Sequence, residues 1–308
     1  MARFYYGGQA VMEGVMMRGR RTVAVAVRAP TGEIIVHQEA VPRPFAGRLF
    51  RLPFFRGLLG LYEMLVLGTR MLLYSAEIAA GDAVGAEATV SSTALGIGTL
   101  VGAFVGVGVF LLVPVLLTRP FDHAGATAIA SNVIEGVIRL AMFIVYLLLI
   151  GRMPDIQRVF AYHGAEHKTI NAYEAGAPLT VDGVRPHSLL HPRCGTGFLL
   201  VVAVLCIVVF AFLGRPPLLL RLLSRVVLIP LVAAIAYEFL RLGANQYHHR
   251  LVRAVLRPSL ALQRLTTREP DDDQIAVALR AFGAVKASDE AVAEAPVVRH
   301  EEAVAVPT

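Results

Sequence analysis

The chain has 308 residues but contains no tryptophan and only two cysteines, Cys194 and Cys206. Two cysteines cannot form the disulfide framework that stabilises small secreted proteins, so we expect Cys194 to be a free thiol. Charged residues are also scarce, at 17% of the chain, and the mean hydropathy is +0.62. Soluble domains carry about 25% charged residues, which excludes an ordinary water-soluble globular protein.

Several common sequence signals are missing as well. The first residues, MARFYYGGQAVMEGVMMRG, place glycines and Glu13 where a signal peptide would have an unbroken apolar core, so we expect insertion to rely on internal segments. Neither a phosphate-loop lysine motif nor a dinucleotide fingerprint occurs. No internal repeat is visible, which disfavours a transporter built from related halves.

Long hydrophobic runs are what the chain has instead. Four runs have the apolarity of membrane spans: 93–117, 132–151, 197–214 and 223–241. At about 1.5 Å per helical residue, the shortest reaches roughly 27 Å, close to the ~30 Å of bilayer hydrocarbon. The sequence therefore predicts a mainly α membrane protein with about four transmembrane helices and a lipid bilayer as its partner.

Basic residues predict the orientation of these spans. Ten arginines precede the first span, nine basic residues follow residue 240, and five more lie in the loop 152–196. The two opposite loops contain only Arg119, Arg215, Arg221 and the borderline Arg225. By the positive-inside rule, we expect both termini and the loop 152–196 on the cytoplasmic side of a bacterial inner membrane. The net charge of +6 then reflects orientation, and no nucleic-acid partner is expected.

The region 1–50 is predicted to be β-rich. The stretch TVAVAVRAPTGEIIVHQEAV alternates β-branched residues around Pro30-Thr31-Gly32-Glu33, which indicates a hairpin. The preceding GGQAVMEGVMMRG is its expected partner, and together they predict a small cytoplasmic sheet.

The remaining regions are predicted to lie at or outside the membrane surface. In the region 51–85, a polar residue recurs every seven positions on an apolar helix, which predicts an interfacial or re-entrant helix that does not span. The region 242–286 is predicted to form cytoplasmic amphipathic helices. The alanine-rich and acidic tail 287–308 has no usable period and is expected to be disordered.

The polar stretch RVFAYHGAEHKTINAYEAG carries the strongest chemical signal. Pro154 and Gly176 predict a helix over 154–175, on which His163 and His167 are one turn apart. Imidazoles at this spacing can converge on one metal ion. Glu166 completes the His-x-x-Glu-His pattern of inverted zinc hydrolases and is the expected general base. Glu174 returns to the same face as a ligand or as a support for one.

A second polar cluster follows in RPHSLLHPRCG, just before the span 197–214. It supplies His187, His191 and Cys194 as candidate third ligands, and His191 is slightly favoured. One of them would leave a coordination position open, as in catalytic zinc sites, whereas all of them together would make a closed structural site. Zinc is the default divalent metal, although iron, manganese and nickel also fit nitrogen and carboxylate ligands.

Each of the other polar residues allows two interpretations. Arg185 and Arg193 flank the second cluster and fit either the binding of an anionic substrate or positive-inside anchoring. Glu238, near the end of the span 223–241, either joins the site or pairs with Arg241. Gln9 and Glu13 lie in a glycine-rich stretch that fits either a binding role or a tight β-turn.

Five of these motifs together resemble the bacterial YqhQ family, which is described as a family of predicted metal-dependent membrane enzymes. They are GGQAVMEGVMMRG, FAYHGAEHKTINAYEAG, VRPHSLLHPRCGTGF, AYEFLRLG and LQRLTTREPDDDQIAVAL, and the similarity runs from about residue 5 to 285. The resemblance implies a shared site at His163, Glu166, His167, His187, His191 and Cys194, with Gln9 and Glu13 as a second patch. It names no substrate.

The sequence thus predicts a membrane-embedded, metal-dependent enzyme, a zinc hydrolase acting at the cytoplasmic face on an unknown membrane-associated substrate. Two other classes stay open. The first is a membrane scaffold or assembly factor with a structural metal. The second is an ion transporter, motivated by Glu135 and Glu238 within predicted spans.

Overall fold

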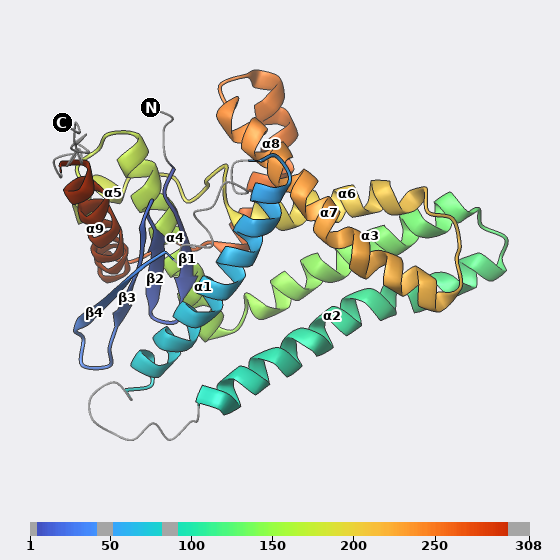
Figure 1. Cartoon of the computed structure of the whole chain (residues 1–308), viewed down its shortest axis with the longest axis horizontal. Helices are drawn as coiled ribbons and strands as arrows, with labels where there is room; N and C mark the ends of the chain where they lie inside the picture. The colour runs from blue at the N-terminus through green and yellow to red at the C-terminus, as the bar shows by residue number, and fades with distance from the viewer. Residues whose placement is uncertain (1–4, 42–51, 82–91, 295–308) are drawn as a thin grey trace, which may run out of the picture.

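The computed structural model describes residues 5–41, 52–81 and 92–294. It has a layered part, in which helices cover a small sheet, and a bundle of apolar helices that extends away from it (Figure 1). Helices account for most of the described residues, so the prediction of a mainly α protein with a small N-terminal sheet is confirmed.

The sheet contains four antiparallel strands in the order β1-β2-β3-β4. Their bounds are Gly7–Val11, Gly14–Arg18, Thr22–Arg28 and Ile34–Ala40. The last two strands form the predicted hairpin, and Gly32 in its turn has φ +88°, a conformation that glycine adopts without strain. The first two strands form the predicted partner hairpin.

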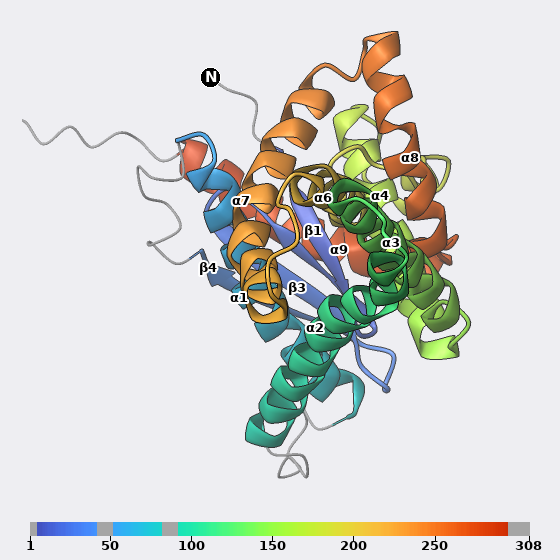
Figure 2. The same cartoon turned by 90° about the vertical axis from the view of Figure 1, so that its right-hand side faces the viewer.

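Helices cover both faces of the sheet, which makes three layers (Figure 2). Val23 and Val25 of β3 pack toward α1 (Phe55–Ala79), whereas Ala24 and Ala26 pack toward α4 (Pro154–Glu174) and α9 (Asp272–Glu294). Successive strand residues point to opposite faces, so this alternation follows directly from the sequence VAVA. β3 is consequently buried on both faces.

The bundle consists of two helical hairpins that point away from the sheet (Figure 1). One is α2 (Ser92–His123) with α3 (Ala128–Ile150), and the other is α6 (Gly195–Ala211) with α7 (Leu218–Asn245). Four described helices are long and apolar enough to cross a membrane, namely α1, α2, α3 and α7. This set has the predicted size but includes α1 and omits α6, which has only 17 residues.

The contacts of the layered part decide between α1 and α6 as spans. The sheet precedes α1 in the chain and packs directly on α4, so an even number of spans must separate them. If α2 and α3 both cross the bilayer, α1 cannot. The same reasoning applies to α4 and α9, which also pack together, so α6 crosses if α7 does. At about 26 Å, α6 is short but adequate for hydrocarbon of ~30 Å.

The predicted polar stripe of α1 connects the helix to its neighbours. Glu63 pairs with Arg18 of β2 at 2.9 Å, Arg70 pairs with Glu39 of β4 at 3.1 Å, and Arg56 pairs with Glu238 of α7. The opposite face is exposed and apolar, with Leu58, Leu65 and Leu72 in a row. One face on the sheet and one apolar face are what an interfacial helix requires.

Two shorter helices complete the described chain, α5 (Val181–Val184) and α8 (Arg250–Thr266). The C-terminal helix α9 continues past Ala287 to Glu294, where the sequence predicted disorder from residue 287 onward. Acids and alanines without an apolar period still form helix, because alanine and glutamate favour it intrinsically. The rest of the predicted tail, 295–308, lies outside the described residues.

Candidate metal centre

The two histidines of the predicted motif lie on α4. This helix begins at the predicted Pro154, with Asp155 in its first turn, and ends at Glu174, one residue earlier than predicted and just before Gly176, whose φ is +71°. The His163 and His167 rings lie one turn apart with their centroids separated by 4.3 Å. The local sequence therefore suffices to bring the two imidazoles together.

Backbone carbonyls orient both rings. Nδ1 of His163 lies 2.8 Å from the carbonyl oxygen of Thr266, and Nδ1 of His167 lies 2.5 Å from that of Leu189. A carbonyl can only accept a hydrogen bond, so each Nδ1 must carry the proton. Each Nε2 then keeps its lone pair in the neutral ring, and a bond from the other ring nitrogen to a carbonyl is typical of metal-ligating histidines.

Cys194 brings a sulfur atom to this pair. It is the N-cap residue of α6, its Sγ accepts from the backbone N–H of Thr196, and it is 7% exposed. The Cys194 Sγ lies 3.3 Å from Nε2 of His163. Ligand atoms of His163, His167 and Cys194 all lie within 4.8 Å of one another. Among the described residues, this is the group whose geometry fits a metal ion.

His191, the slightly favoured third ligand, is placed beside this group instead of in it. Its ring centroid is 5.7 Å from that of His167, and its Nε2 lies 3.2 Å from Nη2 of Arg193. Burial first, and then Arg193, lower the pKa of His191, which favours the neutral ring. Cys194 rather than His191 therefore completes the cluster.

Glu174 supports this arrangement from the end of α4. Its carboxylate pairs with Arg193 and lies 3.8 Å from Nε2 of His191. Burial alone would raise the pKa of Glu174, but His191 and Arg193 together hold it below its ordinary value. Arg193 also stacks on the ring of Tyr5 at 4.2 Å. Both predicted supporting residues, Glu174 and Arg193, are thus engaged with each other.

A glutamine that the sequence reasoning missed fixes the loop before α6. The side-chain amide of Gln263 in α8 donates to the carbonyl of His191 at 2.9 Å and accepts from its N–H at 2.9 Å. Gln263 is fully buried. A buried amide with both groups satisfied holds a backbone segment in one register. No local signal marks this residue, because its partner lies 72 positions away.

Glu166 lies next to the ligands on α4 but outside the three-residue group. Burial raises the pKa of Glu166 to about 7, against the opposing effects of His163 and the N–H of Gly8. A Cβ atom on Gly8 would lie 2.9 Å from Cδ of Glu166, so glycine is what lets β1 approach this carboxyl group. A buried carboxyl group that titrates near neutral pH is suited to proton transfer.

Gln9 and Glu13 do not share a site. The Gln9 side chain reaches α1, where a Cβ atom on Gly68 would lie 2.1 Å from its Oε1. Glu13 occupies the β1–β2 turn with φ +49° and accepts two bonds from Arg158, at 2.6 and 2.5 Å. The bonds from Arg158 lower the pKa of Glu13, although burial opposes them. Glu13 therefore joins the turn to α4, which agrees with the interpretation of this stretch as a tight β-turn.

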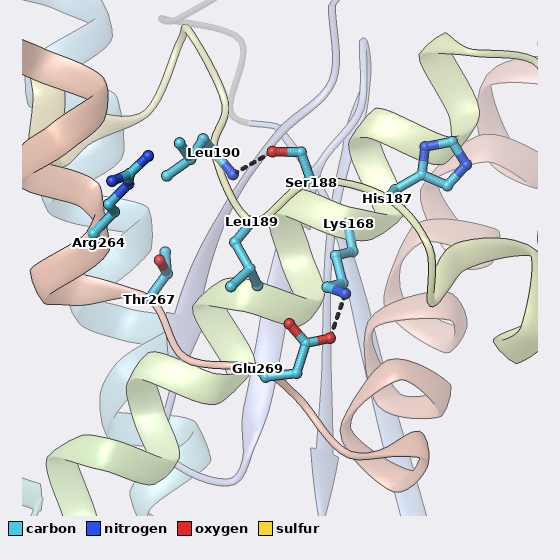
Figure 3. Close-up of a pocket in the computed structure, with 8 residues that line it drawn as sticks. All are labelled: Lys168, His187, Ser188, Leu189, Leu190, Arg264, Thr267 and Glu269. Atoms are coloured by element: carbon cyan, nitrogen blue, oxygen red, sulfur yellow. Dashed lines mark hydrogen bonds and ion pairs between the residues drawn. The ribbon is translucent and has the colours of Figure 1, made fainter. Parts of the chain in front are cut away.

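The remaining predicted residues also have other partners. Arg185 is exposed and pairs with Asp182 and Asp272. Glu238 pairs with Arg56 of α1, Arg241 adds a weaker charge attraction, and Glu238 is not part of the centre. His187 lines a separate cavity of about 330 Å³, together with Lys168, Leu189 and Glu269 (Figure 3). The cavity adjoins the centre, because Leu189 also supplies the carbonyl that orients His167.

Comparisons with known proteins place the whole of this arrangement in one family. The family described as "Protein of unknown function (DUF1385)" matches residues 52–288, a range that includes His163, His167 and Cys194. This chain belongs to the DUF1385 family. It is also 37% identical over 293 residues to "Uncharacterized protein YqhQ" of Bacillus subtilis (strain 168), which covers 90% of this chain and 91% of that protein. The resemblance to the YqhQ family is thereby confirmed. No solved structure matches the chain.

Proposed function

We propose that this DUF1385 protein is an inner-membrane enzyme with a divalent metal centre at its cytoplasmic face, and that it catalyses a hydrolysis. The observation that carries the proposal is the convergence of His163, His167 and Cys194 from two separate elements. If this polar segment merely connected two spans, its histidines would not need this geometry. Backbone carbonyls hold one nitrogen of each ring, which leaves the other nitrogens available close to the Cys194 thiol.

The donor set favours zinc among the divalent metals. Two imidazole nitrogens and one thiolate suit zinc well, whereas manganese prefers oxygen ligands, and iron or nickel would accept the same nitrogens. Three protein ligands are the number found in catalytic zinc sites, which keep a position open for water or substrate. A zinc ion held there would supply Lewis-acid activation of the substrate and of water.

Glu166 is the residue to which we assign proton transfer. It is one position before His167 on α4 and is buried, and the N–H of Gly8 anchors its carboxylate from β1. A carboxylate held beside the open position would take the proton of the attacking water and pass it to the leaving group. The protein's position at the bilayer favours a membrane peptide, a lipid-linked intermediate or a phosphorylated headgroup as its substrate.

One observation favours a structural metal in a non-enzymatic scaffold as the second candidate. The carboxyl group of Glu166 contacts Gly8 and is not one of the three converging groups. A metal ion in a closed site would then serve to join α4 to the start of α6. The third class, an ion transporter, loses its motivation because Glu135 and Glu238 are both paired with arginines.

Metal analysis combined with cobalt(II) substitution tests the proposal. We expect one transition metal per chain in the purified protein, and a thiolate-to-cobalt absorption band that Cys194→Ser abolishes. Addition of azide should change the cobalt spectrum, because azide binds at an open coordination position. Glu166→Gln should retain both the metal and the azide response.

Two results would decide against the enzyme. A purified protein without stoichiometric metal would overturn the metal centre altogether. A cobalt spectrum that keeps the thiolate band but is indifferent to azide would show a closed site and would establish the scaffold instead.

A further inference from the structure

A buried cluster of charged residues lies at the end of the helical bundle remote from the sheet, where each hairpin turns (Figure 1). Its centre is Glu135 of α3, which is 1% exposed. The Glu135 carboxylate contacts three guanidinium groups, those of Arg139 at 2.8 Å, Arg221 at 2.7 Å and Arg225 at 3.1 Å. Glu135 and Arg139 lie four residues apart on α3, and α7 adds two more cations to this pair.

The cluster carries more positive than negative charge. Its second carboxylate, Asp122 of α2, contacts Arg221 and Arg215, each at 3.4 Å. Four guanidinium groups therefore share two carboxylates. Two of these groups are also removed from solvent, because Arg225 is fully buried and the Arg221 side chain is 7% exposed. Charge buried between apolar helices is costly unless it is balanced, so an excess of this kind calls for an anion.

Membrane orientation does not account for these arginines. Arginines that orient spans gather on the cytoplasmic side, and this end is opposite to the basic side of the chain. Arg221 and Arg225 also point inward between the helices, where Arg225 stacks on the Phe210 ring at 4.3 Å. Their position instead requires a role inside the bundle.

The ion pairs around Glu135 are shorter than those around Asp122, so we call the Glu135 side of the cluster tight and the Asp122 side loose. Around Glu135 the shortest contacts are 2.7–3.1 Å, close to the 2.7–2.9 Å usual for charge-assisted hydrogen bonds. Around Asp122 both are 3.4 Å, and its Oδ1 is buried without a hydrogen bond among the described residues. Arg215, with 30% of its side chain exposed, donates no hydrogen bond to any described group. The loose side therefore has an accessible cation with unused donors.

We propose that this loose side, formed by Arg215, Arg221 and Asp122, binds a phosphate group. Guanidinium groups present paired N–H donors that match phosphate oxygens, and the anion would offset the excess charge of the cluster. The site lies at the ends of two spanning hairpins, which is the level of lipid headgroups. The phosphate of an anionic phospholipid is therefore the ligand that the position favours, and inorganic phosphate has the same chemistry.

The test uses the full chain purified in a neutral detergent. Its thermal unfolding is followed during titration with phosphatidylglycerol, with phosphatidylcholine of the same acyl chains, and with inorganic phosphate against chloride of equal ionic strength. We expect phosphatidylglycerol to raise Tm saturably and more strongly than phosphatidylcholine. Arg215→Gln should weaken this binding at least tenfold, whereas Arg119→Gln, at an exposed arginine near the same end, should leave it unchanged.

The outcomes separate the two sources of phosphate. Inorganic phosphate that produces the whole shift, with no further effect of the lipid, would support a phosphate site fed from solution. Arg215→Lys keeps the charge and serves if Arg215→Gln fails to fold; it should retain part of the affinity. The proposal is overturned if neither phosphate source raises Tm, or if Arg119→Gln weakens binding as much as the Arg215 variants do.

Discussion

Nε2 of His163 and Sγ of Cys194 lie 3.3 Å apart, although 31 residues of chain separate them. The first atom comes from the middle of α4 and the second from the N-cap of α6. Because the two belong to different elements, their approach depends on how α4, α6 and α8 pack. This relationship turns a short histidine pattern into a candidate metal centre.

Substitution of a cluster histidine should remove the metal, whereas substitution of a neighbouring histidine should not. His167→Ala deletes one of three converging side chains, so we expect metal affinity to fall by more than the roughly 10- to 100-fold lost when a residue that only supports a ligand is replaced. His187→Ala is the matched control, because His187 lines the adjoining cavity and is absent from the cluster. Metal content after dialysis against a chelator is the measurement. Equal loss in both variants would contradict the assignment of ligands.

Gly164→Ala should destabilise the protein even though alanine favours helix. A Cβ atom at this position of α4 would lie 2.1 Å from the carbonyl oxygen of Arg268 and 2.8 Å from Leu189. Overpacking of this kind costs about 1–3 kcal/mol, which outweighs the ~1 kcal/mol that alanine gains over glycine in a helix.

Gly283→Ala provides the control for that substitution. Gly283 lies on α9 with open space around its Cβ position, so only the helix-propensity gain applies and stability should rise. Thermal or denaturant unfolding of both variants measures the difference. A Gly164→Ala protein as stable as the unsubstituted chain would show that α4 does not pack on the segment around Arg268.

The pair of Glu13 and Arg158 should make stability depend on acidity. The pKa of Glu13 is lowered in the folded protein, chiefly by the bonds from Arg158, so its contribution is complete above the unfolded pKa of about 4.3. It is lost as the pH falls through the lower, folded value. Since the Arg158 side chain is 54% exposed, screening limits the effect to about 1 kcal/mol or less.

Comparison of Glu13→Gln with the unsubstituted chain checks this. The variant should unfold at a lower temperature at pH 7, and the difference should shrink as the pH is lowered below 4. Glu33→Gln removes the same charge from the exposed β3–β4 turn and should show no such trend. If the difference in unfolding temperature between Glu13→Gln and the unsubstituted chain stays constant with pH, the charge of Glu13 does not stabilise the turn.

Cysteine labelling should place the sheet and α9 on one side of the membrane. Cysteines at Thr31 and Ala287 should react with an impermeant maleimide only from the cytoplasmic side, and a cysteine at Ala124 only from the other. The native Cys194 and Cys206 are buried and should remain unlabelled in the folded protein. Opposite sides for Thr31 and Ala287 would mean that the chain crosses the bilayer an odd number of times between them, against the assignment of α1 as interfacial.

Local patterns were sufficient to predict much of this architecture. The bounds of α4 follow from Pro154 and Gly176, and the β3–β4 hairpin follows from alternating valines around Gly32. The apolar runs were found because lipid demands long uninterrupted hydrophobicity. In each case the deciding residues are near neighbours in the chain.

Relationships between distant segments could not be predicted in this way. Whether His191 or Cys194 joins the histidine pair depends on Gln263, which fixes the loop from 72 positions away. Glu166 could be identified as a candidate, but the strand residue Gly8 that covers it could not. The second and third cations on Glu135 come from α7, 86 and 90 residues further along the chain.

The carbonyl of Thr266 that orients His163 comes from a residue 103 positions later in the chain. On a translating ribosome His163 and Cys194 are therefore made well before Thr266 exists, whereas Leu189, which orients His167, is made before Cys194. A nascent or truncated chain that ends before α8 would lack the carbonyl that orients His163 and the Gln263 amide that holds the loop before Cys194. The arrangement of His163 and Cys194 can therefore be completed only after synthesis has passed α7.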